Sequence, residues 1–280
     1  MNDLQKLKVP PTSTLVLQYA QKFYTGKKEK QYLQLIDYSG VAELAAKIDA
    51  LYSSFDELIC LRKFCIREMI RERFLENGIQ QVLILGGGLD PVTIFLMEQY
   101  GNRISHVFEV DNGFIEEKEQ LFRQLFDYGR RMHFIKCDIT DSDLLMAKLA
   151  VAGYQPGIPT IVIFEGVIHY ITNTEFVSLF RYFMTDDHRN IVLMDYSLVL
   201  EEATAAFYQL HKNFLDMVAD SLRIPFNVNY RDTILDLVSQ LDGQDARIHT
   251  YHELEKRLYG ETRLFKARGE GILEVMSFHI

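Results

Sequence analysis

The chain has 280 residues, and its 30 Lys and Arg against 39 Asp and Glu give a formal net charge of −9. An apolar fraction of 48% with 25% charged residues is ordinary globular composition, which excludes a disordered or fibrous chain. At about 100–200 residues per domain, the length allows one large α/β domain or two small ones. The acidic balance disfavours a nucleic-acid partner, because such proteins present a basic face to the phosphates.

The sequence carries no sign of a membrane or secretory destination. No apolar run reaches the length of about 18 residues that a transmembrane helix needs, and the first residues lack the apolar core of a signal peptide. Cys60, Cys65 and Cys137 form no CxxC pair, and their odd number argues against a disulfide framework. We therefore expect a reduced, cytoplasmic protein without a membrane partner, and the oligomeric state stays open.

Residues 1–78 are expected to form a helical N-terminal extension. Its main element is a long helix from Ser53 or Ser54 to about Asn77, because apolar residues recur there at roughly 3.6-residue spacing. Within this helix, the basic residues of the run 62–73 alternate with apolar ones. That pattern favours a solvated helix face over a nucleic-acid patch.

Short, nearly continuous apolar runs follow, and helical stretches separate them. Continuous apolar strands are buried on both faces, so the pattern predicts a parallel sheet covered by helices on both sides. The predicted strands are 82–85, 106–110, 133–137, 160–164 and 191–196, with helices near 91–100, 113–128, 141–152 and 174–184. The predicted fold class is therefore α/β, with a Rossmann-like sheet of five parallel strands.

After the fifth strand the alternation stops, and residues of about 198–260 are expected to form a helical cap. One long helix is predicted over 198–222 and another over 232–241. The segments TRLFKA (262–267) and GILEVMSFHI (271–280) are typical of two strands, which predicts an antiparallel C-terminal hairpin.

The segment QQVLILGGGLD (80–90) combines a strand, three glycines and an acid, and glycines let a backbone approach a ligand closely. A dinucleotide fingerprint fails here, because Pro91 stands where G-x-G-x-x-G/A requires glycine or alanine. What remains is G-x-G-x-D, formed by Gly86, Gly88 and Asp90. An acid at that position disfavours a pyrophosphate and suits a ligand with a cationic amine, such as S-adenosylmethionine (SAM).

Further acids follow the ends of predicted strands. Asp111 stands about 20 residues beyond the glycine turn, where a carboxylate accepts hydrogen bonds from both ribose hydroxyls; Glu109 is the weaker candidate, and helix capping is the alternative role for Asp111. Asp138 directly follows the third strand, where an acceptor would meet the adenine amino group. Glu165 follows the buried fourth strand, and since burying an unpaired acid costs several kcal/mol, we expect a functional role.

The chain resembles the leucine carboxyl methyltransferase family in pieces that occur in the family's order and spacing: ICLRKF, QQVLILGGGLD, HVFEVDNGFIEEK, CDIT and FEGVIHYIT. The resemblance covers about residues 55–196. It implies a SAM-dependent O-methyltransferase of the class I Rossmann-like fold, with residues 79–280 as the methyltransferase domain. The region 198–260 matches no specific pattern, which leaves the substrate open.

The resemblance implies a role in SAM binding for each matching residue. Arg62 matches the arginine that holds the SAM carboxylate, and Gly86 and Gly88 would approach the methionine moiety. The other implied contacts are Asp111 at the ribose, Asp138 with Ile139 at the adenine, Glu165 near the amine and the transferring methyl, and Tyr170 of the strand-four motif. The chain departs from the family where Pro91-Val92 replaces a common Thr-Arg.

His169 and Tyr170 are the candidate catalytic residues. A carboxylate acceptor is ionised at neutral pH and needs no base, whereas a phenol or an alcohol needs a general base with a pKa around 7. His169 stands where relatives carry an aliphatic residue, so it could deprotonate a hydroxyl; a merely structural, hydrogen-bonded histidine is the alternative. In the cap, Tyr208, His211 and Arg223 are further candidates.

The sequence thus predicts a SAM-dependent O-methyltransferase that acts on a carboxylate or hydroxyl of a small molecule or peptide. It contains no metal-binding signature. A tRNA-modifying methyltransferase, which the acidic charge disfavours, and an inactive SAM-binding regulatory module are the alternatives.

Overall fold

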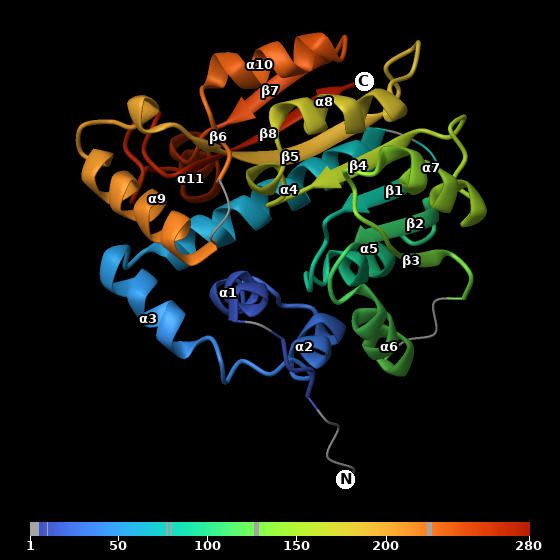
Figure 1. The fold of residues 1–280 in the computed structure, drawn as a ribbon, viewed down its shortest axis with the longest axis horizontal. Helices are drawn as coiled ribbons and strands as arrows, with labels where there is room; N and C mark the ends of the chain where they lie inside the picture. Colours follow the sequence, from blue (N-terminus) through green and yellow to red (C-terminus); the bar gives the residue numbers. More distant parts are fainter. Residues whose placement is uncertain (1–5, 10, 77, 79, 126–128, 223–225) are drawn as a thin grey trace.

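The structure is a computed structural model that describes residues 6–9, 11–76, 78, 80–125, 129–222 and 226–280. Within these residues the chain forms a sheet of eight strands, in the order β3-β2-β1-β4-β5-β8-β7, with β6 beside the end of β5 (Figure 1). The strands are β1 (Gln80–Leu85), β2 (Ile104–Asp111), β3 (Met132–Lys136), β4 (Thr160–Phe164), β5 (Ile191–Leu198), β6 (Val228–Asn229), β7 (Gln244–His249) and β8 (Leu273–His279). The first five pair in parallel, as the sequence predicts.

Helices connect the strands and extend the chain on its N-terminal side. They are α1 (Pro11–Tyr19), α2 (Lys27–Leu33), α3 (Ala42–Leu51), α4 (Phe55–Glu76), α5 (Val92–Tyr100), α6 (Ile115–Leu125), α7 (Ser142–Val151), α8 (Asn173–Phe180), α9 (Tyr208–Leu222), α10 (Arg231–Gln240) and α11 (Tyr251–Tyr259). Helix α4 confirms the long predicted helix, whose expected last residue, Asn77, lies outside the described residues. The division of the chain near residue 78 stays a prediction.

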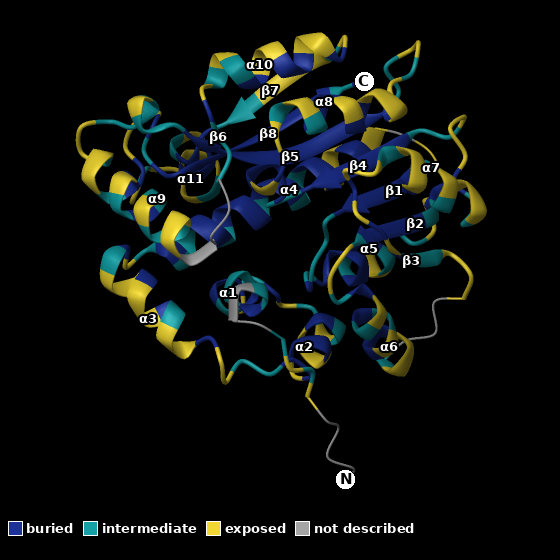
Figure 2. Cartoon of the chain, viewed as in Figure 1, coloured by how far each residue is buried: buried dark blue, intermediate teal, exposed yellow. Residues whose placement is uncertain are grey.

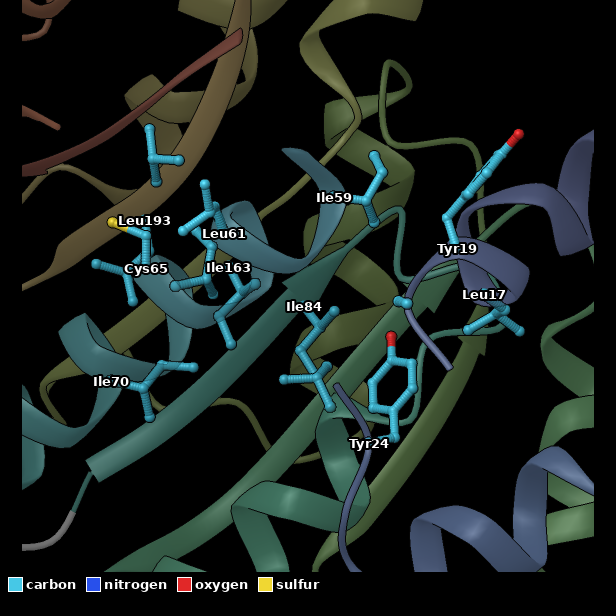
Figure 3. Packing of buried hydrophobic residues seen from close by; sticks show 14 of the residues in the cluster. Leu17, Tyr19, Tyr24, Ile59, Leu61, Cys65, Ile70, Ile84, Ile163 and Leu193 are labelled. Atoms are coloured by element: carbon cyan, nitrogen blue, oxygen red, sulfur yellow. The ribbon is translucent and has the colours of Figure 1, made fainter. Parts of the chain in front are cut away.

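The central strands β1, β4 and β5 are buried on both faces. Neighbouring residues in a strand point to opposite sides of the sheet, so each strand contributes to two layers of the core. In β1, Val82 and Ile84 pack with α4, α5, α6 and α11, whereas Leu83 and Leu85 pack with α7, α8 and α10. Figure 2 shows the central strands as buried and the outer faces of the helices as exposed. Figure 3 shows the first cluster, where α4 side chains such as Ile59 approach the strands.

The C-terminal strands are antiparallel, but they are not the predicted hairpin. Strand β8 pairs with β5 on one side and with β7 on the other, and α11 stands between β7 and β8 in the sequence. The segment 262–267, predicted as a strand, has no strand structure. Strand β7 escaped prediction because four of its six residues are exposed, so it carries no apolar run.

The predicted helical cap over 198–260 is also wrong in part, since β7 and the short β6 lie within it. The long helix expected over 198–222 begins only at Tyr208. Strand β5 continues through Leu198, where Ser197 and Leu198 pair with β6, and a short 3₁₀ helix covers Leu200–Glu202. Among the described residues, no helix has the length and apolar character needed to cross a membrane.

Glu255 explains why residues 262–267 form a loop. Its side chain is almost fully buried and accepts the backbone N–H groups of Arg263, Leu264 and Phe265 at 2.7, 3.0 and 3.0 Å. The Phe265 N–H is buried and would otherwise need another partner, because a buried N–H without an acceptor is costly. The carboxylate thus takes the place of a neighbouring strand.

We predict that Glu255→Ala lowers the free energy of unfolding by about 3 kcal/mol, because the buried Phe265 N–H loses its acceptor and two part-buried hydrogen bonds to a charged group are lost with it. Glu253→Ala, in the same helix, removes only part of the Thr250 capping box and should cost about 1 kcal/mol. Urea unfolding followed by circular dichroism measures both. Equal losses in the two variants would contradict the role given to Glu255.

Candidate active site

The glycine turn after β1 shapes one side of the site. Gly86 and Gly88 have φ values of +68° and +49°, a region that side chains rarely adopt. A Cβ on Gly86 would lie 2.6 Å from Val167 Cγ2, whereas a Cβ on Gly88 would meet no described atom within 4 Å. Gly86 is therefore required by packing, and Gly88 presents bare backbone to open space.

Lys118 of α6 binds the backbone of this turn from the protein interior. Its fully buried ammonium donates to the carbonyl oxygens of Gly88 at 3.1 Å and Asp90 at 2.5 Å, and it forms an ion pair with Glu109. Burial raises the pKa of Glu109, while Lys118 and a hydrogen bond from Thr93 oppose that rise. Glu109, the weaker ribose candidate, is therefore a buried partner of Lys118, the residue that binds the turn.

Asp111 lies at the end of β2 and faces the turn. Its Oδ2 accepts the N–H of Gly88 at 2.8 Å, and its Oδ1 accepts the N–H of Gly113 at 2.7 Å. A carboxylate has about four lone-pair positions, so each oxygen keeps room for another donor. This arrangement suits a carboxylate that binds two neighbouring hydroxyls.

Asp138 and Ile139 follow β3, the next strand outward. Asp138 is exposed, and its Oδ1 accepts the N–H and the hydroxyl of Thr140 at 2.9 and 2.7 Å. Ile139 is buried. The two residues lie at the same edge of the sheet as Asp111, because β2 and β3 are parallel neighbours.

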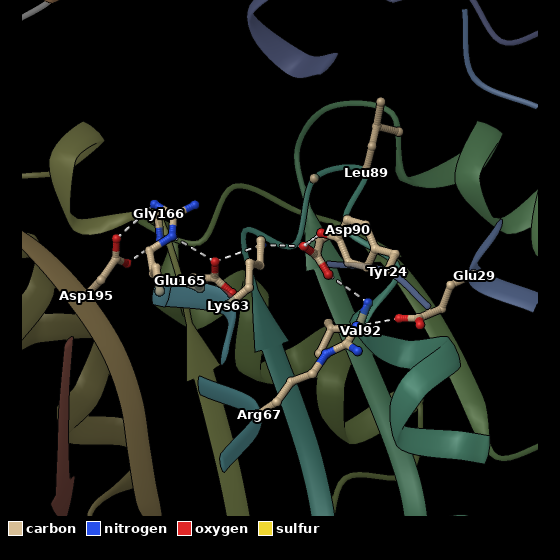
Figure 4. Close-up of polar contacts among 12 residues, drawn as sticks. Tyr24, Glu29, Lys63, Arg67, Leu89, Asp90, Val92, Glu165, Gly166 and Asp195 are labelled. Atoms are coloured by element: carbon tan, nitrogen blue, oxygen red, sulfur yellow. Dashed lines mark hydrogen bonds and ion pairs between the residues drawn. The ribbon is translucent and has the colours of Figure 1, made fainter. Parts of the chain in front are cut away.

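A buried ion cluster lies at the ends of β4 and β5. Arg62 of α4 contacts Glu165 Oε1 through Nε at 2.9 Å and Asp195 Oδ2 through Nη1 at 3.0 Å. Lys63 contacts the same Glu165 oxygen at 2.7 Å and forms a second ion pair with Asp90. Figure 4 shows the cluster as a chain of contacts that runs from Asp195 to the glycine turn.

Burial and charge act in opposite directions on these groups. Burial disfavours the charged form of Arg62, but Asp195 and Glu165 outweigh this effect and hold its pKa above the ordinary value. Burial likewise raises the pKa of Asp195, but Arg62 and His169 bring it well below the ordinary range. For Asp90, Lys63 and the hydroxyl of Tyr24 outweigh burial and lower the pKa to about 2. All three stay charged at neutral pH.

The expectation of a solvated face for the run 62–73 is wrong. Arg62, Lys63 and Arg73 are buried, with 6%, 6% and 8% of their surfaces exposed. Arg62 and Lys63 have acidic partners inside the protein, which offset the cost of burying their charges. Only residues such as Arg71, whose side chain is 52% exposed, fit the original expectation.

Sequence reasoning missed four residues of this region: Tyr24, Lys63, Lys118 and Asp195. Tyr24, in the loop after α1, donates its hydroxyl to Asp90 at 2.6 Å. Asp195 could have been recognised from the sequence, because it is a lone acid in the apolar run IVLMDY, and Glu165 was selected as a lone acid at a buried strand. Lys63 and Lys118 carry no such signal, since their partners lie on other elements, Asp90 after β1 and Glu109 in β2.

His169 and Tyr170 lie in a 3₁₀ turn after β4. His169 is 3% exposed, its ring stacks on Phe226 with centroids 4.9 Å apart, and its Nε2 lies 3.5 Å from Asp195 Oδ2. Tyr170 is half exposed, and its ring stands edge-on to Phe226. The structure thus places the histidine against the ion cluster and the tyrosine beside it.

An apolar cavity of about 160 Å³ lies beside the cluster. Arg62, Gly166, His169 and Tyr170 line it on the cluster side. Most of the remaining wall comes from α1, α3, α4 and α9 and is aliphatic or aromatic. Charged groups and an apolar space therefore meet at Arg62 and Gly166.

Two cap candidates lie away from this wall. Tyr208 is exposed and His211 is fully buried, and neither belongs to the described lining of the cavity. Burial lowers the pKa of His211. The third candidate, Arg223, lies outside the described residues.

A glycine turn after β1, acids at the ends of β2, β3 and β4, and this strand order define a class I SAM-dependent methyltransferase. The chain belongs to the leucine carboxyl methyltransferase family, whose model matches residues 16–184. A comparison with curated protein sequences finds no match.

Solved structures share the fold. A DUF574 family protein from Streptomyces avermitilis is 12% identical, with a TM-score of 0.65 over 95% of this chain and 96% of its own. A putative methyltransferase from Thermobifida fusca is 15% identical, with a TM-score of 0.65 over 99% of this chain and 96% of its own. At these identities the likeness shows the fold alone.

The family makes SAM the cofactor, and the residues present fit it. Gly88 faces open space, and both oxygens of Asp111 have lone pairs left. Among the described residues, Arg62 contacts its carboxylates through Nε and Nη1 only. A guanidinium has five N–H donors, so Nη2 remains for a further carboxylate.

We predict that Lys118→Met lowers the free energy of unfolding by about 3–5 kcal/mol, because it leaves Glu109 buried without its partner. Adding Glu109→Gln should recover part of this loss. Lys136→Met is the matched control, since its ion pair with Glu116 is exposed and should be worth less than about 1 kcal/mol. Denaturant unfolding distinguishes the variants, and similar losses for Lys118 and Lys136 would refute the buried pair.

Asp90 should make stability depend on acid pH. Its pKa is about 2 in the folded chain and about 4 in an unfolded one, so its contribution of roughly 2 kcal/mol is complete above pH ~4 and is lost as pH falls toward ~2. Wild type should therefore exceed Asp90→Asn in stability at pH 6, and the gap should close in acid. Asp216→Asn, on the exposed face of α9, should show no such gap. A gap that is independent of pH would contradict this assignment.

Proposed function

We propose that this protein is an O-methyltransferase that moves the methyl group of SAM to a hydroxyl or carboxylate oxygen of a small acceptor. The observation that supports this is the position of the apolar cavity, which shares Arg62 with the proposed cofactor site and is also lined by Gly166, the residue after Glu165. The transferring methyl group would lie near Glu165, next to that shared wall. An acceptor in the cavity would then present its oxygen to the methyl carbon.

In this proposal, residues at the strand ends bind successive parts of the cofactor. Asp111 accepts both ribose hydroxyls, and Asp138 with Ile139 holds the adenine beyond them. Gly86 and Gly88 let the backbone approach the methionine moiety, where Asp90 lies beside the turn. Glu165 attracts the cofactor's amine, and Arg62 takes its carboxylate through Nη2.

The chain's contribution to the reaction is alignment and exclusion of water. Methyl transfer is an in-line displacement for which SAM supplies an activated methyl group. Holding two reactants in line contributes on the order of 7–11 kcal/mol to such a step. The apolar wall also excludes water, which strengthens the attraction between a negative acceptor oxygen and a positive sulfonium. His169 and Tyr170 are the proposed catalytic residues at the shared wall.

We predict that calorimetric titration detects micromolar binding of SAM and S-adenosylhomocysteine, and that Asp111→Ala weakens it at least about 10-fold. The variant removes two hydrogen bonds to a charged group, each worth about 1.5–3 kcal/mol. Asp187→Ala, at an exposed ion pair before the start of β5, is the control and should bind as wild type does. Binding that survives Asp111→Ala would remove the ribose role of this residue.

The oxygen specificity is tested by incubating the protein with isotope-labelled SAM and a panel of small carboxylic acids, phenols, alcohols and amines. Mass spectrometry of the products locates the methyl group, and alkaline hydrolysis separates esters from ethers. Methyl groups on oxygen support the proposal. Transfer to nitrogen alone would overturn it, while retaining the methyltransferase assignment.

A further inference from the structure

The cavity is large enough to hold one aromatic ring. Its volume of about 160 Å³ is close to that of an engineered apolar cavity of about 150 Å³ that binds benzene. Much of its wall is formed by Val16, Ile48, Phe55, Ile59, Phe214 and Met217. A wall of this kind favours an apolar ring over a peptide backbone or a sugar, whose polar groups it could not satisfy.

His169 lines the polar end of this cavity, beside Arg62, Gly166 and Tyr170. Its Nε2 lies 3.5 Å from Asp195 Oδ2, so the tautomer with the proton on Nε2 is favoured by the carboxylate. Within the described part of the chain, neither ring nitrogen has a hydrogen-bond partner. Nδ1 is therefore left as an acceptor, and a buried polar atom without a partner points to a ligand that uses it.

Asp195 is itself held in place. It accepts the N–H of Gly166 at 2.5 Å and contacts Nη1 of Arg62 at 3.0 Å. Because these contacts fix its carboxylate inside β5, Asp195 provides a stationary negative charge beside the imidazole. Such a charge orients the ring and stabilises it when it gains a proton.

The charges around the cavity favour a neutral acceptor. Of the described residues that line it, Arg62 is the sole Lys or Arg, and it already contacts Glu165 and Asp195. With Lys63 and Asp90, the cluster holds two cations against three carboxylates. Bound SAM adds one net positive charge and balances them, so a carboxylate acceptor would add an uncompensated charge at an apolar wall.

We propose that the acceptor is a phenol, and that His169 takes its proton while Asp195 orients the imidazole. The proposal rests on the proposed function and names its substrate class. The O–H bond breaks, and its proton moves to Nδ1 of His169. An electron pair of the oxygen forms the new bond to the methyl carbon, and the pair of the broken carbon–sulfur bond stays on sulfur. His169 is then a catalytic residue, and Asp195 is a positioning residue.

The first test is binding without turnover. Wild-type protein is loaded with sinefungin, an analogue that carries an amine in place of the sulfonium, and is titrated with phenol and with benzoate in a calorimeter. We expect phenol to bind at least about 10-fold more tightly, because benzoate brings a charge that the wall does not compensate. Equal or tighter binding of benzoate overturns the proposal.

The second test follows the proton. Phenol labelled with ¹³C at the carbon that bears oxygen shifts its NMR signal when its hydroxyl donates a hydrogen bond to a base. We expect this shift in the wild-type complex and none in His169→Phe, which keeps a ring stacked on Phe226 but accepts no hydrogen bond. Asp195→Asn should bind phenol and show a smaller shift. Equal shifts in wild type and His169→Phe contradict the role of His169, and His169→Gln replaces that variant if it fails to fold.

The third test is turnover. His169→Phe should lower kcat for phenol at least about 10²-fold, the contribution typical of a general base, while its affinity for S-adenosylhomocysteine stays unchanged. Asp195→Asn should lower kcat more than it raises KM. His106→Gln, at the opposite end of β2, is the histidine control and should keep the wild-type rate. An unchanged kcat in His169→Phe overturns the proposal.

Failure of the proposed function and failure of the acceptor assignment give different results. If wild-type protein binds neither SAM nor S-adenosylhomocysteine, the proposed function itself fails. If it binds both and methylates benzoate but not phenol, only the acceptor class and the role of His169 are overturned.

Discussion

The ion pairs of Arg62 with Glu165 and Asp195 determine where the N-terminal helices meet the sheet. Arg62 and Asp195 lie 133 positions apart in the sequence, yet their contact joins α4 to the buried strand β5. Burying three charges costs several kcal/mol per ion, and the cost is recovered only if each charge keeps its partner. Helix α4 therefore has one favourable position, and that position closes the wall of the cavity through Phe55, Ile59 and Arg62 itself.

A second buried pair, Lys118 with Glu109, also holds the glycine turn. Lys118 donates to the carbonyl oxygens of Gly88 and Asp90, and Lys63 of α4 pairs with the Asp90 carboxylate, so lysines from two helices fix the backbone between Gly86 and Asp90. Tyr32 of α2 adds a hydrogen bond to the carbonyl of Leu89 at 3.0 Å. The N-terminal helices thus take part in shaping the turn, although they stand outside the sheet (Figure 1).

The sequence predicted those features that depend on short stretches of chain. Five parallel strands were recognisable as apolar runs, and Asp111, Asp138 and Glu165 could be placed because each lies at or just after a strand end. Strand β7 could not be recognised, since an exposed edge strand needs no apolar residues. Lys63 and Lys118 were equally hidden, because the sequence does not distinguish a buried lysine from an exposed one until its carboxylate partner is known.

In the proposed function, the two reactants occupy regions of different character. The cofactor, which carries charges of both signs, would meet carboxylates, backbone N–H groups and the remaining donors of Arg62 at the strand ends. The cavity offers the acceptor almost no charge, so electrostatic forces between the two reactants are weakly screened where they meet. Arg62 belongs to both sides. Because its charge is already compensated by Glu165 and Asp195, Arg62 can border an apolar space without requiring a further anion from the acceptor. In the proposal, the shape of the wall and His169 then select the acceptor.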